Sequence, residues 1–148
     1  MAVLSYTKQG AIGVAPEEVF DFGSDLRNEL VWNPNAEQVE KLADGPVRVG
    51  TRFRARWSNA GEVIVEVVEF DRPQSWATRS IARGMEVVFR GTVAAQDDGT
   101  RYVGRMELRP RGLAWLYAPF ALLAMSRQDV TNMRLIKESL ESGDEDRG

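Results

Sequence analysis

The 148 residues of this chain are enough for one domain with a sizeable core, and 43% of them are hydrophobic. The net charge of −3 argues against a basic field that would attract nucleic acid. Because the sequence contains neither cysteine nor histidine, it excludes disulfides, thiolate nucleophiles, Ser-His-Asp catalysis and zinc sites built from these residues. We therefore expect no metal and no cofactor.

The N-terminal residues 1–8 lack a basic region followed by an apolar one, so we expect no secretory signal and a cytoplasmic protein. The longest apolar run, Leu113–Met125, is too short to span a bilayer, and we expect no stable membrane insertion. This run could touch a membrane surface, but it lacks the basic face that such helices usually carry.

The first part of the chain combines one strand with two short helices. Residues 3–14 alternate as a strand does. Ala15–Glu18 is typical of a helix start, since Pro16 is tolerated in a first turn and acidic residues favour the positive helix end. A second short helix is predicted from Leu26 to Val31 after an N-cap signal at Ser24–Asp25.

Alternating patterns predict six further strands, separated by turns that contain Gly, Asn, Asp or Pro. They cover residues 39–42, 51–58, 62–70, 76–81, 85–96 and 101–109. Strands joined by hairpins form an antiparallel sheet. One face of these strands is apolar and the other charged, so one face of the sheet should be covered and the other wet.

The remainder of the chain, up to about Ser142, is predicted to be helical. Pro119 divides it into a short piece, Leu113–Ala118, and a main helix that is long enough to cover the sheet. The residues expected to face the sheet recur at helical spacing: Phe120, Leu123, Val130, Met133 and Leu140. Residues 143–148 are expected to form a flexible acidic tail after a single domain of residues 1–142.

Alternation places large side chains on the inner face of the sheet: Phe53, Trp57, Trp76, Phe89, Tyr102 and Met106. They either line a cavity, in which the Tyr102 hydroxyl is a polar handle, or fill a solid core, and alternation does not separate the two. Gly91 and Gly104 lie on the same face, where either the helix or a ligand is expected to approach closely.

Arg127 follows Phe120 by seven residues and falls on the same predicted stripe. It either points into the cavity, where it would pair with a carboxylate or enolate, or reaches the rim and pairs with an acidic residue. Tyr102 and Arg127 are the candidates for an acid and an oxyanion stabiliser if the protein is an enzyme. Asp129 and Asn132 are expected to face solvent.

The outer face of the sheet is rich in arginine. It is either a docking face for an anionic partner or a set of cross-strand ion pairs with Glu62, Glu66, Glu86 and Glu107, and the interleaved acids favour pairing. The arginines concerned are Arg52, Arg54, Arg56, Arg90, Arg101, Arg105 and Arg109.

Several motifs, in their order and spacing, resemble the START/Bet v 1-like helix-grip superfamily, and within it the bacterial polyketide cyclase/dehydrase-like (SRPBCC) group. They are residues 15–22, Ser24-Asp25, Trp32-Asn33-Pro34, Asp44-Gly45-Pro46 with residues 50–53, residues 69–73 and the terminal helix. The resemblance implies an α+β helix-grip fold. In this fold a curved antiparallel sheet of about seven strands wraps around a long C-terminal helix, with two short helices after the first strand.

The resemblance also implies a hydrophobic cavity between helix and sheet. The expected function is binding or transport of a small hydrophobic ligand, such as a lipid or polyketide, by a monomer or a dimer. The alternatives are a cyclase/dehydrase-like enzyme acting on a carbonyl compound and a regulatory or toxin-like interaction module. The expected ligand-binding residues are Trp32, Phe53, Trp57, Trp76, Phe89, Tyr102, Met106, Phe120, Leu123 and Arg127.

Overall fold

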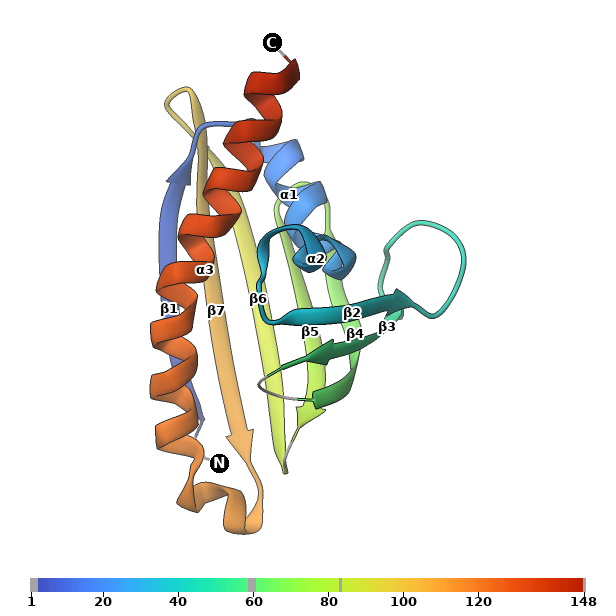
Figure 1. Cartoon of the computed structure of the whole chain (residues 1–148), viewed down its shortest axis with the longest axis vertical. Coiled ribbons are helices and arrows are strands. Elements are labelled where there is room, and N and C mark those ends of the chain that lie inside the picture. Colours follow the sequence, from blue (N-terminus) through green and yellow to red (C-terminus); the bar gives the residue numbers. More distant parts are fainter. Residues whose placement is uncertain (1–2, 59–60, 83, 148) are drawn as a thin grey trace.

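A seven-stranded antiparallel sheet and a long C-terminal helix form the body of the molecule (Figure 1). The computed structural model describes residues 3–58, 61–82 and 84–147. The strands are β1 (Leu4–Ile12), β2 (Ala36–Lys41), β3 (Arg52–Trp57), β4 (Gly61–Asp71), β5 (Ser75–Ala82), β6 (Met85–Gln96) and β7 (Gly99–Pro110). The helices are α1 (Pro16–Ser24), α2 (Glu29–Trp32) and α3 (Ala118–Arg147), with short 3-10 segments η1 (Leu26–Asn28) and η2 (Gly112–Leu116).

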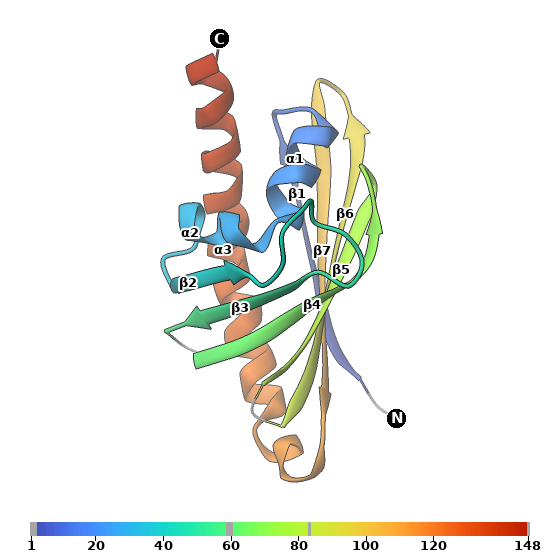
Figure 2. The same ribbon diagram turned by 90° about the vertical axis from the view of Figure 1, so that its right-hand side faces the viewer.

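The strands lie in the order β1-β7-β6-β5-β4-β3-β2, so the first strand returns beside the last. The sheet twists strongly, and β2 and β3 run almost across the direction of β1 and β7 (Figure 1). Helices α1 and α2 lie on the same side of the sheet as α3 (Figure 2), and α2 contacts both α3 and β2. The predicted α+β helix-grip arrangement is confirmed.

The predicted boundaries differ from the structure mainly at the helix end. The short piece before Pro119 is the 3-10 segment η2, and Pro119 lies in the first turn of α3 as expected. Helix α3 continues through Arg147, beyond the predicted end at Ser142. Its late turns are supported by an ion pair one turn apart, Lys137 Nζ to Glu141 Oε2 at 3.3 Å.

Among the residues that the structure describes, buried apolar side chains group into three clusters. The α1 cluster lies where α1 and the second half of α3 meet the sheet: Ile12, Val14, Val19, Phe20, Trp76, Val93, Tyr102 and Leu140. The η2 cluster lies at the start of α3: Met85, Leu108, Ala114 and Ala118. The β3–β4 cluster comprises Ala55, Val63 and Val65.

The prediction for the inner face of α3 is largely wrong. Phe120, Leu123 and Val130 are exposed, whereas Leu122, Met125, Met133 and Ile136 pack against the clusters. Of the predicted stripe, Met133 and Leu140 do face the sheet. The helix approaches the sheet through the buried Ala118 and the half-buried Ala121, whereas Phe120 and Leu123 point away from it.

The two inner-face glycines are approached by neighbouring aromatic side chains, and not by the helix or a ligand as predicted. Trp76 lies opposite Gly91 in the β5–β6 register, and a Cβ atom at Gly91 would lie 2.3 Å from the Trp76 ring. At Gly104 the nearest atom is in the Phe89 ring, 3.3 Å away. Glycine at position 91 therefore lets Trp76 lie flat on the sheet.

Several arginines of the outer face pair with acidic residues of neighbouring strands. Arg52 Nε lies 3.2 Å from Glu66 Oε1, and Arg54 lies between Glu40 and Glu62 at 3.3 and 3.7 Å. Arg109 contacts Glu86 at 3.4 Å and Glu107 at 3.3 Å. Cross-strand pairing is therefore the interpretation that the structure supports for this face.

Candidate functional site

Helix α2 brings an acidic side chain into the interior of the protein. The chain turns tightly before it: Asp25 Oδ1 accepts a hydrogen bond from the Arg27 amide at 3.1 Å, and Asn28 Nδ2 donates to the Phe22 carbonyl at 3.0 Å. These contacts fix the segment that precedes Glu29, the first residue of α2. The Glu29 carboxyl group consequently points inward from a helix of only four residues.

The Glu29 carboxyl group is shielded from solvent and incompletely hydrogen-bonded. Asn33 Nδ2 donates to Oε1 at 2.9 Å, and the Trp57 side chain also hydrogen-bonds to the carboxyl group. Oε2 is buried, and it has no hydrogen-bond partner of ordinary geometry among the described residues. Burial raises the pKa of Glu29 to about 7, against the opposing effect of the hydrogen bonds from Asn33 and Trp57.

A second interior carboxyl group comes from α3. The Tyr6 hydroxyl on β1 donates to Asp129 Oδ2, and Asn132 Nδ2 donates to Asp129 Oδ1 at 3.0 Å. Burial raises the pKa of Asp129, while the Tyr6 and Asn132 hydrogen bonds and the Lys8 charge act in the opposite direction. The prediction that Asp129 and Asn132 face solvent is wrong, because both side chains are half-buried and hydrogen-bonded within the protein.

Tyr102 lies close enough to both carboxyl groups to respond to their charges. Its ring packs against Trp76, with centroids 6.0 Å apart. Burial raises the pKa of the Tyr102 hydroxyl, and the negative charges of Asp129 and Glu29 add to this increase. Burial likewise raises the pKa of Tyr6, and the charge of Asp129 and its hydrogen bond with Tyr6 raise it further. Both phenols therefore remain neutral at physiological pH. We call Glu29, Asp129, Tyr6 and Tyr102 the carboxyl–tyrosine cluster.

Apolar side chains of the sheet lie beside this cluster. Phe89, Met106 and Trp57 lie on the inner face of the sheet, yet each remains partly exposed. Phe89 faces Met106 across β6 and β7, and Met106 in turn faces Tyr6 across β7 and β1. The region between α3, α2 and the sheet therefore combines accessible apolar surface with a few interior polar groups.

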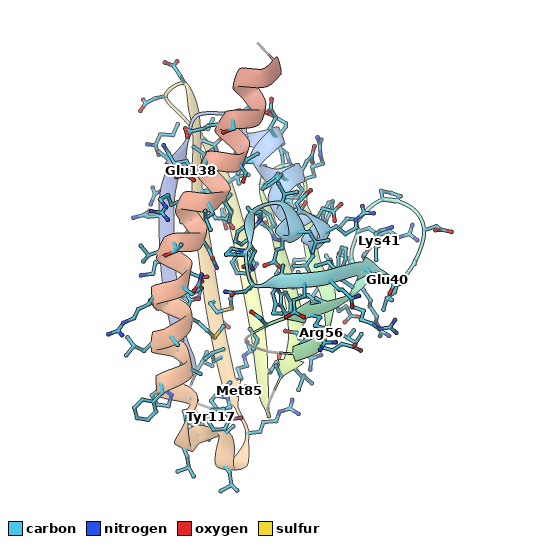
Figure 3. All side chains as sticks on the ribbon, viewed as in Figure 1. Glu40, Lys41, Arg56, Met85, Tyr117 and Glu138 are labelled. Atoms are coloured by element: carbon cyan, nitrogen blue, oxygen red, sulfur yellow. The ribbon has the colours of Figure 1, made fainter. Side chains whose placement is uncertain are left out.

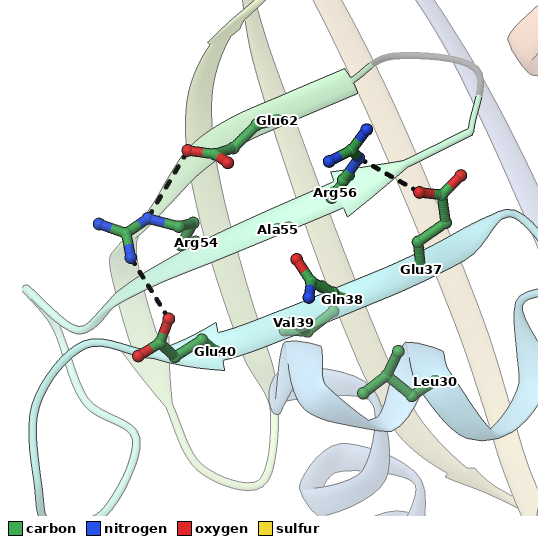
Figure 4. A pocket seen from close by; sticks show the side chains of 9 residues that line it. All are labelled: Leu30, Glu37, Gln38, Val39, Glu40, Arg54, Ala55, Arg56 and Glu62. Atoms are coloured by element: carbon green, nitrogen blue, oxygen red, sulfur yellow. Dashed lines mark hydrogen bonds and ion pairs between the residues drawn. The ribbon is translucent and has the colours of Figure 1, made fainter.

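The two pockets that the structure shows most clearly lie elsewhere. One, of about 290 Å³, is lined by Leu30 and by residues of β2, β3 and β4, and ion pairs of Arg54 and Arg56 cross it (Figure 4). The other, of about 260 Å³, lies between α1 and the loop before β3, next to the Arg72–Asp21 ion pair. Neither contains a member of the carboxyl–tyrosine cluster. Among the described residues, no three acidic side chains gather as a metal site would require.

The structure divides the predicted ligand-binding residues into three groups. Tyr102 belongs to the carboxyl–tyrosine cluster, Trp57, Phe89 and Met106 are partly exposed on the inner face of the sheet, and Trp32 is half-buried at the end of α2. Phe53 and Trp76 are fully buried. Phe120, Leu123 and Arg127 are exposed.

The interpretation in which Arg127 points into a cavity is wrong. Arg127 is two residues from both Met125 and Asp129, and this spacing places it on the opposite side of the helix from those inward residues. The sequence prediction did not include Glu29 or Tyr6, and it placed Asp129 in solvent. For Asp129 a signal existed, since it lies four residues from both Met125 and Met133 on the inner stripe.

Comparisons with known proteins agree with this architecture. The family model described as "polyketide cyclase / dehydrase and lipid transport" matches residues 3–135. No curated protein matches the sequence. Several solved structures match the fold, at sequence identities too low to transfer a function.

Three of these structures show the breadth of the fold. The Zhui aromatase/cyclase from Streptomyces sp. R1128 aligns with a TM-score of 0.79 and 15% identity, covering 95% of this chain and 94% of the other. Ara h 8.0201 aligns with a TM-score of 0.74 and 16% identity over 95% and 99%. TTHA0849 from Thermus thermophilus aligns with a TM-score of 0.72 and 17% identity, covering 95% of this chain and 99% of the other. The chain therefore belongs to the polyketide cyclase/dehydrase and lipid transport family, and it shares its helix-grip fold with these solved structures.

Proposed function

We propose that the protein binds a small, largely apolar molecule between α3, α2 and the sheet, and that a hydroxyl or amine group of this molecule donates a hydrogen bond to Glu29. The observation that carries the proposal is the buried Glu29 Oε2, which lacks a hydrogen-bond partner among the described residues. An unsatisfied buried acceptor costs about 1–3 kcal/mol, and a ligand donor would remove this cost.

The charges of the region support a ligand that donates hydrogen bonds. Glu29 and Asp129 bring two carboxyl groups to it, whereas Arg127, the predicted partner for a ligand carboxylate, is on the exposed side of α3. Lys8 is close enough for its charge to act on Asp129. A ligand carboxylate would meet like charge in a medium of low dielectric constant, so a fatty acid is a poor candidate.

Three probes that share one apolar body test this selectivity: 2-naphthol, 2-naphthylamine and 2-naphthoate, measured by isothermal titration calorimetry at pH 8. We expect 2-naphthol to bind at least about tenfold more tightly than 2-naphthoate, the equivalent of one charge-assisted hydrogen bond. Glu29→Gln should reduce this preference. Glu138→Gln, which removes the same charge from an exposed position of α3 (Figure 3), should not.

Equal or tighter binding of 2-naphthoate would overturn the donor preference. Failure of all three probes to bind, together with native mass spectra of the purified protein that show no bound apolar molecule, would overturn ligand binding itself.

A second candidate function is acid–base chemistry on a carbonyl compound. The specific observation in its favour is the pKa of Glu29, about 7, which suits a general base near neutral pH. Glu29 would remove a proton from the carbon next to the carbonyl group, and the neutral Tyr102 hydroxyl would donate a hydrogen bond to the resulting enolate oxygen. In this version Tyr102 takes the stabilising role that the sequence suggested for Arg127.

The two functions differ in what they require of Glu29. An enzyme of this kind would exchange the acidic C–H protons of 2-tetralone for deuterium in D₂O, and Glu29→Gln would abolish the exchange while the ketone still binds. A binding protein would leave the exchange rate of the ketone at its uncatalysed value.

A further inference from the structure

One end of the molecule exposes large apolar side chains. Segment η2 and the start of α3 form this end (Figure 1), and Tyr117 marks its position in Figure 3. Leu113 is 81% exposed, Leu116 74% and Phe120 73%. We call this surface the apolar tip; its members are Leu113, Trp115, Leu116, Tyr117, Phe120 and Leu123.

The apolar tip is held firmly by its other side. Ala114 and Ala118 are buried in the η2 cluster, together with Met85 and Leu108 of the sheet. The amide of Ala114 donates to the Arg111 carbonyl at 3.1 Å, and that of Tyr117 to the Ala114 carbonyl at 3.2 Å. The exposed side chains therefore project from an ordered segment, and their exposure is a property of the fold. Contiguous apolar surface of this kind usually marks an interaction site.

The segment that forms the tip carries positive charge and no negative charge. Residues 110–128 contain no Asp or Glu, and this segment carries Arg111 and Arg127. Arg79, Arg109 and Arg111 all approach the carboxyl group of Glu86, at 3.0, 3.4 and 3.6 Å, and Arg109 also contacts Glu107 at 3.3 Å. The opposite end carries Asp97 and Asp98 in the exposed β6–β7 turn (Figure 1). The protein is acidic as a whole, but an anionic surface would attract the end that bears the apolar tip.

The chemistry of the tip distinguishes a lipid surface from a second copy of the chain. A twofold interface sets the same patch against itself, so the positive charges of Arg111 and Arg127 would be present on both sides, with no acidic residue of segment 110–128 to pair with. The tip also combines Trp115 and Tyr117 with Leu and Phe side chains, which is the composition that prefers the boundary between lipid headgroups and acyl chains.

We infer that the apolar tip docks reversibly on the surface of an anionic lipid bilayer, with Leu113, Leu116 and Phe120 in the headgroup region and the flanking arginines near lipid phosphates. Docking requires no membrane-spanning element, and no helix in the described part of the chain is long and apolar enough to be one. The inference rests on the tip alone and stands apart from the identity of any ligand near Glu29.

Vesicle flotation tests the inference, with phosphatidylcholine vesicles compared with mixed phosphatidylcholine–phosphatidylserine vesicles. We expect the wild-type protein to bind the mixed vesicles, and Leu116→Glu/Phe120→Glu to weaken this binding at least about tenfold. Val49→Glu/Ile64→Glu is the matched control, because it places the same charges on exposed apolar positions outside the tip. Its binding should remain within about twofold of wild type.

Two further variants separate the contribution of apolar surface to vesicle binding from that of positive charge. Leu116→Ser/Phe120→Ser removes apolar surface without adding negative charge, and should still weaken binding several-fold. Arg111→Gln/Arg127→Gln should reduce the preference for anionic vesicles. Quenching of tryptophan fluorescence by brominated lipids should disappear in Trp115→Phe, since Trp115 is the tryptophan in the tip.

Three results would overturn the inference. The first is a wild-type protein that does not float with either kind of vesicle, and the second is equal binding by the wild type and Leu116→Glu/Phe120→Glu. The third is a wild-type dimer in sedimentation velocity that Leu116→Glu/Phe120→Glu dissociates, without vesicle binding by the wild type. That result would assign the tip to a second copy of the chain.

Discussion

Glu29 shows how a single side chain gives this interior its chemical character. Its carboxyl group loses hydration on burial, and this is the largest cause of its raised pKa. Hydrogen bonds from Asn33 and Trp57 favour the ionised form, but they are too few to restore an ordinary pKa, and the Asp129 charge adds to the increase. The group is therefore balanced between its two protonation states near neutral pH.

This balance predicts an unusual dependence of stability on pH. The pKa of Glu29 rises from 4.5 to about 7 on folding, so between these values the folded protein binds more protons than the unfolded chain. The free energy of unfolding should therefore fall as pH rises through this range, by up to about 3 kcal/mol. Asp129, whose pKa is also raised, acts in the same direction. Urea denaturation at a series of pH values measures the slope.

Glu29→Gln should flatten the slope between about pH 5 and 8, since the chain contains no histidine that titrates there. Glu138→Gln, on the exposed face of α3, should leave it unchanged. Identical slopes for wild type and Glu29→Gln would show that the carboxyl group is hydrated in solution.

The sequence could not have singled out Glu29. It lies in a helix too short to show a periodic pattern, and Trp57, which interacts with its carboxyl group, comes from the separate strand β3 and meets it only in the folded chain. Tyr102, by contrast, could be placed on the inner face because β7 alternates regularly. Period-two alternation gives the face of a side chain, but it gives no information about which side chains from separate elements will meet.

At the scale of elements, α3 carries two stripes that both contain apolar residues. Phe120, Leu123 and Val130 form one, and they are exposed; Leu122, Met125 and Leu140 belong to the other, which faces the sheet. Hydrophobicity alone favours the stripe with Phe120. The inner stripe was harder to recognise because it contains small alanines and the polar Asp129, whose partner Tyr6 lies on a strand 123 residues earlier.

Two leucine-to-alanine substitutions on α3 should therefore differ sharply. Leu140 is only 9% exposed and belongs to the α1 cluster, so Leu140→Ala should lower the free energy of unfolding by about 2–4 kcal/mol. Leu123 is 51% exposed, so Leu123→Ala should lower the free energy of unfolding by less than about 0.5 kcal/mol. Urea denaturation of both variants measures the difference. Similar losses for both would mean that the exposed stripe of α3 is covered in solution.

At the scale of the whole molecule, alternation and turn residues were sufficient to predict the seven strands, and Pro119 was sufficient to predict the start of α3. The division of the interior into three clusters was not predictable. It arises because β2 and β3 turn across the sheet while α3 follows β1, and this geometry is set by the twist and not by any single segment (Figure 1). As a result, the carboxyl–tyrosine cluster lies among the α1, η2 and β3–β4 clusters.

The ion pairs on the outer face of the sheet are exposed, and this limits their effect on the stability of the whole molecule. The side chains of Arg54 and Glu40 retain 49% and 65% of their accessible surface, and Arg54 also shares its charge with Glu62 (Figure 4). Such pairs contribute about 0–1 kcal/mol each to the free energy of unfolding, because the cost of ordering two long side chains offsets part of their attraction. The sheet is instead held by its hydrogen bonds and by the inner apolar clusters.

Salt should therefore affect the ion pairs on the outer face of the sheet and the arginines beside the apolar tip differently. Raising KCl from about 0.05 to about 0.5 M should change the free energy of unfolding by less than about 1 kcal/mol, measured by urea denaturation. The same increase should weaken docking of the apolar tip on anionic vesicles, because that attraction acts between exposed charges. A loss of several kcal/mol in unfolding free energy would instead make the outer-face arginines a structural element of the sheet.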